Sequence, residues 1–188
     1  MNILIISSSV RTTRKSHWAA LGVQKYLQQS SELEVRMLDL MEYPLPLLDA
    51  TFGAQKDPKP QTEFINSELH WADAMIFVSP EYNGSYSSAL KNFVDTFAKG
   101  PFKDKPIGVC SVTTGGMGGM RGALQMQTLV LAVYAFPMPE MLLVPKVAEQ
   151  FGEDGSLLNE AYEAKMAVFS QKLVWFTKRM LQGETINA

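Results

Sequence analysis

The stretch NILIIS at residues 2–7, with the loop SSSVRTTRKS at residues 7–16, decides the fold of this chain. The first part is a nearly continuous apolar run, which is typical of a strand buried on both faces of a parallel sheet. Behind the polar loop, apolar residues recur at helical spacing over residues 16–29, and two serines end the pattern. A buried strand, a polar loop and a helix form the opening unit of an α/β fold.

The same unit recurs along the rest of the sequence. Strands are predicted at residues 2–7, 34–40, 74–79, 106–112 and 141–144, and helices at residues 16–29, 61–71, 87–99, 119–133 and 159–181. Right-handed crossovers turn this succession into a doubly wound three-layer sandwich, in which a five-stranded parallel sheet has helices on both faces. Residues 41–60 contain four prolines and no clear period, so they predict a long surface loop of the kind that often covers a site.

The composition fits one globular domain over residues 1–188, since 46% of the residues are hydrophobic and 19% are charged. The sequence has 17 Lys and Arg and 19 Asp and Glu, which gives a net charge of -2. This charge supplies no basic field that would attract a nucleic acid. Neither a signal peptide nor a membrane span is predicted, because the N-terminus lacks a basic segment and no apolar stretch is long enough. The lone Cys110 excludes an intramolecular disulfide and fits a cytoplasmic protein.

The first loop has the composition of an anion-binding site. Ligands of such sheets bind beyond the carboxyl ends of the strands, and this loop joins one of these ends to a helix. It carries six hydroxyl side chains and three cations but no acid. Hydroxyl, guanidinium and free backbone N–H donors at a helix start suit a phosphate, with His17 beside it. The alternative is a solvated turn in which Ser16 caps the helix.

What the first loop lacks narrows the choice of phosphate ligand. A Gly-x-x-x-x-Gly-Lys-Ser/Thr motif is absent, which disfavours a P-loop nucleotide hydrolase. No glycine precedes Gly22, so the fingerprint that admits a dinucleotide pyrophosphate is missing, and Asp39 is interpreted as structural rather than as a ribose ligand. A glycine-free, hydroxyl-rich first loop is instead typical of flavodoxin-like domains that hold the terminal phosphate of FMN.

Two further loops, at residues 80–88 and 112–121, follow the third and fourth predicted strands. The first, PEYNGSYSS, offers two tyrosines and an amide, which suit the wall and the heteroatoms of a flat ring. The second, VTTGGMGGMR, has four glycines that let its backbone approach a ligand closely. A mobile glycine hinge without a ligand is the alternative interpretation of this second loop.

Together these motifs resemble the NAD(P)H-dependent FMN reductase family of flavodoxin-like proteins, which includes quinone, azo-dye and chromate reductases. The resemblance rests on Ser9, Arg11 and Ser16, on PEYNGS and ALKN at residues 80–85 and 89–92, and on TTGGMGGMRG at residues 113–122. It implies the strand order 2-1-3-4-5, bound FMN, NADPH or NADH as electron donor, and a homodimer or homotetramer with each FMN near a subunit interface. The additional cations Arg14 and Lys15 favour NADPH, because its 2′-phosphate seeks guanidinium contacts.

The resemblance also implies a set of cofactor-binding residues. The first loop would hold the FMN phosphate, the second would line the ring and ribityl chain, and the third would close the other edge. The residues expected to bind the cofactor are Ser9, Arg11, Ser16, His17, Pro80, Glu81, Tyr82, Asn83, Gly84, Ser85, Thr113 and Gly115.

The function that follows is an FMN-dependent oxidoreductase, which transfers a hydride from NAD(P)H to bound FMN and on to a quinone, azo compound, metal oxyanion or free flavin. No side chain is expected to act as a catalytic acid or base, because the flavin carries the chemistry. The two histidines have no carboxylate spacing that predicts a metal site, and Cys110 is interpreted as a core residue. Two alternatives stay open: a flavodoxin-type electron carrier, whose docking surface would normally be strongly acidic, and a non-enzymatic FMN-binding module.

Overall fold

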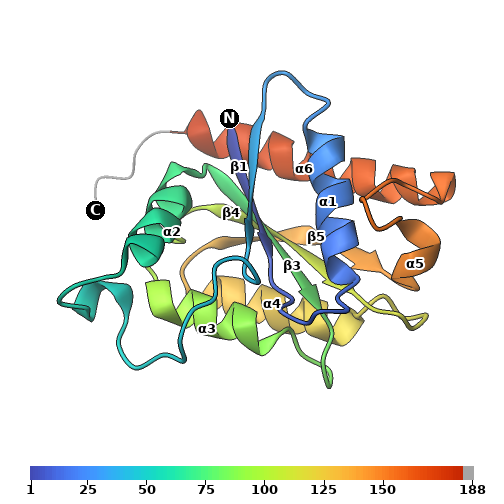
Figure 1. The fold of residues 1–188 in the computed structure, drawn as a ribbon. Coiled ribbons are helices and arrows are strands. Elements are labelled where there is room, and N and C mark those ends of the chain that lie inside the picture. Colours follow the sequence, from blue (N-terminus) through green and yellow to red (C-terminus); the bar gives the residue numbers. More distant parts are fainter. Residues whose placement is uncertain (184–188) are drawn as a thin grey trace.

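The computed structural model describes residues 1–183 and shows a parallel sheet between two layers of helices (Figure 1). The strands are β1 (Asn2–Ser7), β2 (Glu34–Asp39), β3 (Ala74–Pro80), β4 (Pro106–Val112) and β5 (Phe136–Val144). Their order is β2-β1-β3-β4-β5, and every pairing is parallel. The predicted flavodoxin-like fold and its strand order are therefore confirmed.

The helices alternate with the strands along the chain. They are α1 (Ser16–Leu27), α2 (Pro60–Trp71), α3 (Ser88–Phe97), α4 (Met120–Ala132), the short α5 (Val147–Gln150) and α6 (Glu160–Leu181). Two apolar cores result, one on each face of the sheet: α1, α5 and α6 cover one face, and α2, α3 and α4 cover the other. Among residues 1–183, none of these helices is long and apolar enough to cross a membrane.

Strand β1 shows how the sequence builds both cores at once. Ile3 and Ile5 belong to the core beneath α1 and α6, whereas Leu4 and Ile6 belong to the core beneath α2, α3 and α4. Successive side chains of a strand point to opposite faces, so a continuous apolar run is required where both faces are covered. This is the physical reason for the NILIIS sequence.

Three elements differ from the prediction. β5 begins at Phe136, whereas the predicted strand begins at residue 141, because Pro137 and Pro139 argue against a strand. β5 lies at the edge of the sheet, where proline is tolerated. The four-residue α5 is too short to show a helical period, so its sequence does not predict a helix. The long loop after β2 contains one turn of 3-10 helix, η1 (Phe52–Ala54).

The carboxyl ends of the five parallel strands meet at one edge of the sheet, and the loops that follow β1, β3 and β4 lie together there. Backbone hydrogen bonds join them: the Ser8 N–H donates to the Val78 carbonyl at 3.0 Å, and the Glu81 N–H donates to the Val112 carbonyl at 3.1 Å. The buried Ser87, which caps α3, also donates its hydroxyl to the Ser8 carbonyl at 2.9 Å. The fold thus brings the three predicted ligand loops to one place.

Candidate cofactor-binding site

A cleft of about 350 Å³ opens where the three loops meet at the carboxyl edge of the sheet. Its volume lies within the range of small-molecule sites. Seven of the twelve residues predicted to bind the cofactor line it, namely Ser9, Arg11, Ser16, Pro80, Glu81, Tyr82 and Thr113. The other residues that line the cleft are Thr13, Arg14, Lys15, Val112, Thr114 and Val147. Val147 could not be predicted, because it belongs to the unpredicted α5, whereas the hydroxyl content of the first loop could have indicated Thr13.

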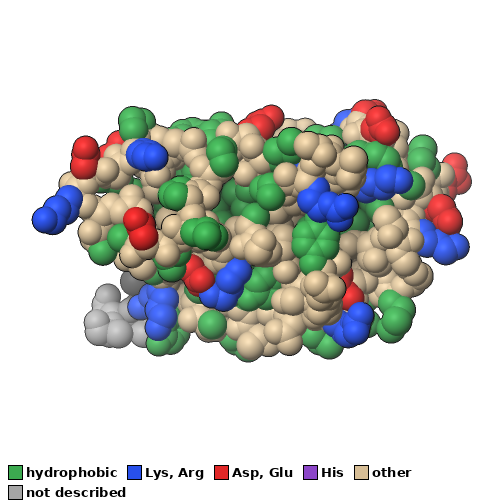
Figure 2. Space-filling model, turned by 60° about the horizontal axis from the view of Figure 1, so that its bottom comes forward, with side chains coloured by type: hydrophobic (Ala, Val, Ile, Leu, Met, Phe, Trp, Pro, Cys, Tyr) green, Lys and Arg blue, Asp and Glu red, His purple; other side chains and the backbone are tan. Residues whose placement is uncertain are grey.

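The face of the molecule that carries these loops has a mixed charge. Lys and Arg side chains alternate with hydrophobic ones over it, and the acidic side chains are scattered rather than gathered into one patch (Figure 2). A flavodoxin-type carrier would normally dock its protein partner through a strongly acidic surface. The visible face has no such surface.

The start of α1 leaves donors without partners. Ser16 is the first residue of the helix, and the position before it, Lys15, provides no side-chain cap. The interpretation of Ser16 as the helix cap is therefore wrong. Its hydroxyl is buried in a residue that is only 5% exposed, and within the described chain it has no hydrogen-bond partner. A buried hydroxyl and free helix N–H groups, with no acid in the first turn, fit an anion such as a phosphate.

Two more residues of the first loop, Ser9 and Arg11, line the same cleft as Ser16. The Ser9 hydroxyl lies 3.2 Å from the Tyr82 hydroxyl, and the Arg11 guanidinium lies 5.8 Å from the centre of the Tyr82 ring. Arg11 is exposed and forms no ion pair with residues 1–183, unlike Arg14, Arg36 and Arg121. An unpaired guanidinium beside an aromatic ring suits a phosphate ester that carries a ring system.

Arg14, which lines the cleft, and His17, which does not, both contact the Asp39 carboxylate. Arg14 donates both terminal nitrogens to the Asp39 carboxylate and one of them to the Ser9 carbonyl at 2.9 Å. His17 Nδ1 lies 2.9 Å from the Ser7 hydroxyl, and burial lowers the pKa of His17, although Asp39 opposes this. The structural role predicted for Asp39 is thus confirmed. His17 does not line the cleft, and Arg14 is paired, so it is not a free cation for a second phosphate.

Among residues 1–183, Glu81 is the one acid that lines the cleft, and its carboxylate has two hydrogen-bond donors. Its carboxylate accepts the backbone N–H of Gly122 at 3.0 Å and an Nη atom of Arg121 at 3.1 Å. A carboxylate at the start of a helix is favourable, because it faces the positive end of the helix dipole. Glu81 therefore joins the β3 loop to α4 and does not repel an anion from the cleft.

Apart from His17, the remaining predicted residues do not line the cleft but follow Tyr82 or Thr114, which do. Tyr82 and Ser85 exchange backbone hydrogen bonds of 2.8 and 3.0 Å, while Asn83 and Gly84 between them have φ angles of 53° and 82°. This is the type I′ turn that Asn-Gly favours, and it fixes the backbone of Tyr82. Gly115 donates its N–H to the Thr113 hydroxyl at 3.1 Å, which holds the third loop.

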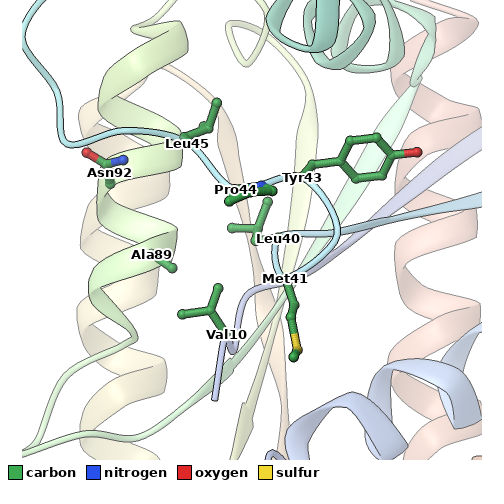
Figure 3. A pocket seen from close by; sticks show the side chains of 8 residues that line it. All are labelled: Val10, Leu40, Met41, Tyr43, Pro44, Leu45, Ala89 and Asn92. Atoms are coloured by element: carbon green, nitrogen blue, oxygen red, sulfur yellow. The ribbon is translucent and has the colours of Figure 1, made fainter. Parts of the chain in front are cut away.

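A second, apolar pocket of about 290 Å³ lies beside the first loop. Val10, the segment after β2 and the side chains of Ala89 and Asn92 from α3 surround it (Figure 3). The Asn92 amide holds the loop in place, since it donates to the Pro46 carbonyl at 2.7 Å and accepts the Leu48 N–H at 2.9 Å. The long loop after β2 thus covers a pocket, which its composition suggested, although its sequence did not identify the lining residues.

Metal and thiol chemistry find no support in the described part of the chain. Residues 1–183 contain no group of three or more His, Cys, Asp or Glu that could hold a metal ion. Cys110 lies in β4 with no exposed surface, and burial raises the pKa of its thiol. Cys110 is therefore a core residue, as predicted, and not a nucleophile.

The sequence is similar to those of known flavin-dependent reductases. A profile of the family described as NADPH-dependent FMN reductase matches residues 1–149. An NADPH:quinone oxidoreductase of Arabidopsis thaliana is 29% identical, over 98% of this chain and 95% of its own length. An FMN-dependent NADPH-azoreductase of Staphylococcus saprophyticus is 26% identical, over 95% of this chain and 96% of its own length.

Solved structures support the fold. A flavoenzyme NAD(P)H:(acceptor) oxidoreductase from Paracoccus denitrificans superposes with a TM-score of 0.82 at 22% identity, covering 95% of this chain and 98% of its own. A flavodoxin from the domain Archaea superposes with a TM-score of 0.62 at 10% identity, covering 95% of this chain and 99% of its own. Because the family profile spans residues 1–149 of 188, the chain belongs to the NADPH-dependent FMN reductase family.

Proposed function

We propose that this protein binds FMN in the cleft and uses NADPH to reduce a small-molecule electron acceptor. The observation that carries the proposal is the buried Ser16 hydroxyl, which lacks a partner within residues 1–183 and lies at the uncapped start of α1, in the same cleft as the exposed Arg11. When bound, FMN accepts a hydride from NADPH and passes the electrons to the acceptor. The protein supplies position and polar contacts, and no side chain needs to act as an acid or base.

The residues divide between the two ends of the cofactor. Ser9, Arg11 and Ser16 would hold the phosphate, because they line the cleft in which α1 begins. Pro80, Glu81 and Tyr82 would line the ring and ribityl chain, with Thr113 at the opposite edge. His17, Asn83, Gly84, Ser85 and Gly115 would support these residues from the margin rather than touch the cofactor.

We infer that the acceptor is a quinone or an azo compound. The relatives named above are a quinone oxidoreductase and an azoreductase, and this chain covers nearly their whole length. The electron-carrier alternative is less favoured, because acidic side chains do not gather on the face that carries the loops. Residues 1–188 would form one domain, and the cytoplasmic location and the lack of a nucleic acid partner remain predictions from composition.

We also propose that the protein forms a homodimer or homotetramer through α4. Met120, Leu124 and Leu131 on this helix are 38%, 52% and 61% exposed, at spacings that place them on one side. Met117, in the third loop just before α4, is another apolar side chain with a large exposed fraction, 79%. The substitution Leu124→Glu should lower the mass measured by light scattering, whereas Leu158→Glu, at a similarly exposed site before α6, should not. An unchanged mass in Leu124→Glu contradicts the proposed interface.

Steady-state kinetics test the proposed activity. FMN-loaded protein should oxidise NADPH when a quinone or an azo dye is added, with the parallel double-reciprocal lines of a mechanism in which NADP⁺ leaves before the acceptor binds. Protein that retains FMN but turns over no acceptor would support the binding-module alternative. Turnover that requires a reduced partner protein instead of NADPH would support the electron carrier.

A further inference from the structure

We propose that Asp39 is a positioning residue for the FMN phosphate. It acts through Arg14, which fixes the first loop in the shape that presents Ser9 and Arg11 to the cleft. The inference rests on the proposed function, since it requires the phosphate of FMN to bind at this loop. Asp39 itself does not line the cleft.

The first step of the argument is the geometry of the ion pair. The two terminal nitrogens of Arg14 each donate to one oxygen of the Asp39 carboxylate, and the side chains are only 13% and 7% exposed. A bidentate pair fixes the plane of the guanidinium, which a lysine at this position could not do. From that plane, Nη1 reaches the Ser9 carbonyl at 2.9 Å. The orientation of the Ser9 peptide is thus tied to the end of β2.

The second step concerns what else holds the loop. Ser8 is bonded to β3 and to Ser87, and the Ser9 hydroxyl meets Tyr82. From residue 10 to residue 14, the hydrogen bonds within the described chain are one backbone bond, from the Arg14 N–H to the Arg11 carbonyl, and those of the Arg14 side chain. Arg14 is therefore the anchor for the part of the loop that carries Arg11. A preformed loop binds a phosphate more tightly than one that must be ordered on binding.

The third step is that Asp39 joins further segments. Its Oδ1 atom accepts the backbone N–H of Met41 at 3.1 Å, and its Oδ2 atom lies 3.5 Å from His17 Nδ1. Met41 and Val10 lie at one end of the apolar pocket (Figure 3). One carboxylate thus ties together the phosphate loop, α1 and the loop that covers this pocket. Removal of Asp39 would leave the Arg14 charge buried without a partner, so the guanidinium would have to move.

Binding of FMN and of riboflavin to the apoprotein separates positioning from general stability, because riboflavin lacks the phosphate. The variants are Asp39→Asn, which keeps the shape of the side chain, Arg14→Ala, Arg14→Lys and the double variant Arg14→Ala with Asp39→Asn. Each single variant should weaken FMN binding by about tenfold or more, the effect of a lost charged hydrogen-bond network, and riboflavin binding by less than about threefold. The double variant should bind FMN about as well as the weaker single variant, because the two residues act as a unit.

Matched controls keep the outcomes distinct. Glu32→Gln removes an exposed ion pair with Lys178, far along the sequence from the cleft residues, and should change neither affinity. Equal losses of FMN and riboflavin affinity in Asp39→Asn, or no loss of either, overturn the inference. If Arg11→Ala also leaves FMN binding unchanged, the proposed phosphate site is wrong. If Arg11→Ala weakens FMN binding and Asp39→Asn does not, only the positioning role of Asp39 is wrong.

Discussion

The substitution Ser16→Ala should have opposite effects on the free protein and on the complex with FMN. In the free protein the Ser16 hydroxyl is buried without a partner among the described residues. A buried hydroxyl without a partner lowers the free energy of unfolding by about 1 to 3 kcal/mol. Alanine also favours the helix over serine by roughly 0.5 kcal/mol. The apoprotein of the variant should therefore be at least as stable as the wild type, with a gain of about 1 kcal/mol raising Tm by roughly 2 to 4 °C.

The complex should instead be weakened. In the proposed site the Ser16 hydroxyl donates to the charged phosphate, and a hydrogen bond to a charged group contributes about 1.5 to 3 kcal/mol. Its loss corresponds to a roughly tenfold to hundredfold increase in the Kd for FMN. The two effects can be measured on one preparation, by thermal unfolding of the apoprotein and by titration with FMN.

Ser170→Ala is the matched control for this experiment. The Ser170 hydroxyl is also buried and has no hydrogen-bond partner within residues 1–183, but it lies in α6 and does not line the cleft. This variant should gain stability in the same way and keep the wild-type affinity for FMN. The reasoning is refuted if Ser16→Ala binds FMN as tightly as the wild type, or if both variants lose affinity equally.

Three further predictions concern other parts of the site. Burial lowers the pKa of His17 below its usual 6.5, so the His17 imidazole binds a proton more readily in the unfolded chain than in the folded one. The free energy of unfolding should therefore fall as the pH drops below 6.5, and His17→Gln should flatten the pH profile of Tm. Gly119→Ala should cost at least about 2 kcal/mol in chemical denaturation, since the new Cβ would lie 2.3 Å from the Ser111 hydroxyl at a φ of +75°. Asn92→Ala should speed amide exchange in residues 41–60 and cost about 1 kcal/mol, because two hydrogen bonds to that loop are lost, whereas exchange at the wild-type rate would contradict this role.

The buried strands and the helices with a clear apolar period could be predicted from the sequence. β1 and β4 are continuous apolar runs, and their observed bounds are those predicted. A strand that is buried on both faces has a nearly continuous apolar sequence, which ends where the strand ends. The ends of these strands, and the ligand loops that follow them, could therefore be located in the sequence. β5 was predicted too short because its edge position, which makes two prolines acceptable, depends on the sheet order rather than on the local sequence.

The side-chain directions within the loops could not be predicted in the same way. Arg14 and Arg11 are alike in sequence, yet Arg14 pairs with Asp39 after a separation of 25 residues and Arg11 stays unpaired within residues 1–183. The partner comes from the end of the neighbouring strand, so only the fold reveals which cation is free. Glu81 similarly turns to the start of α4, a contact across 40 residues that no local pattern encodes.

Anaerobic reduction of the FMN-loaded protein by NADPH tests the central claim most directly. After excess FMN is removed, one equivalent of NADPH should bleach the visible flavin band, and a quinone added next should restore it without further NADPH. A band that stays yellow with NADPH, while FMN remains bound, would contradict the assignment of this protein as an NADPH-dependent reductase.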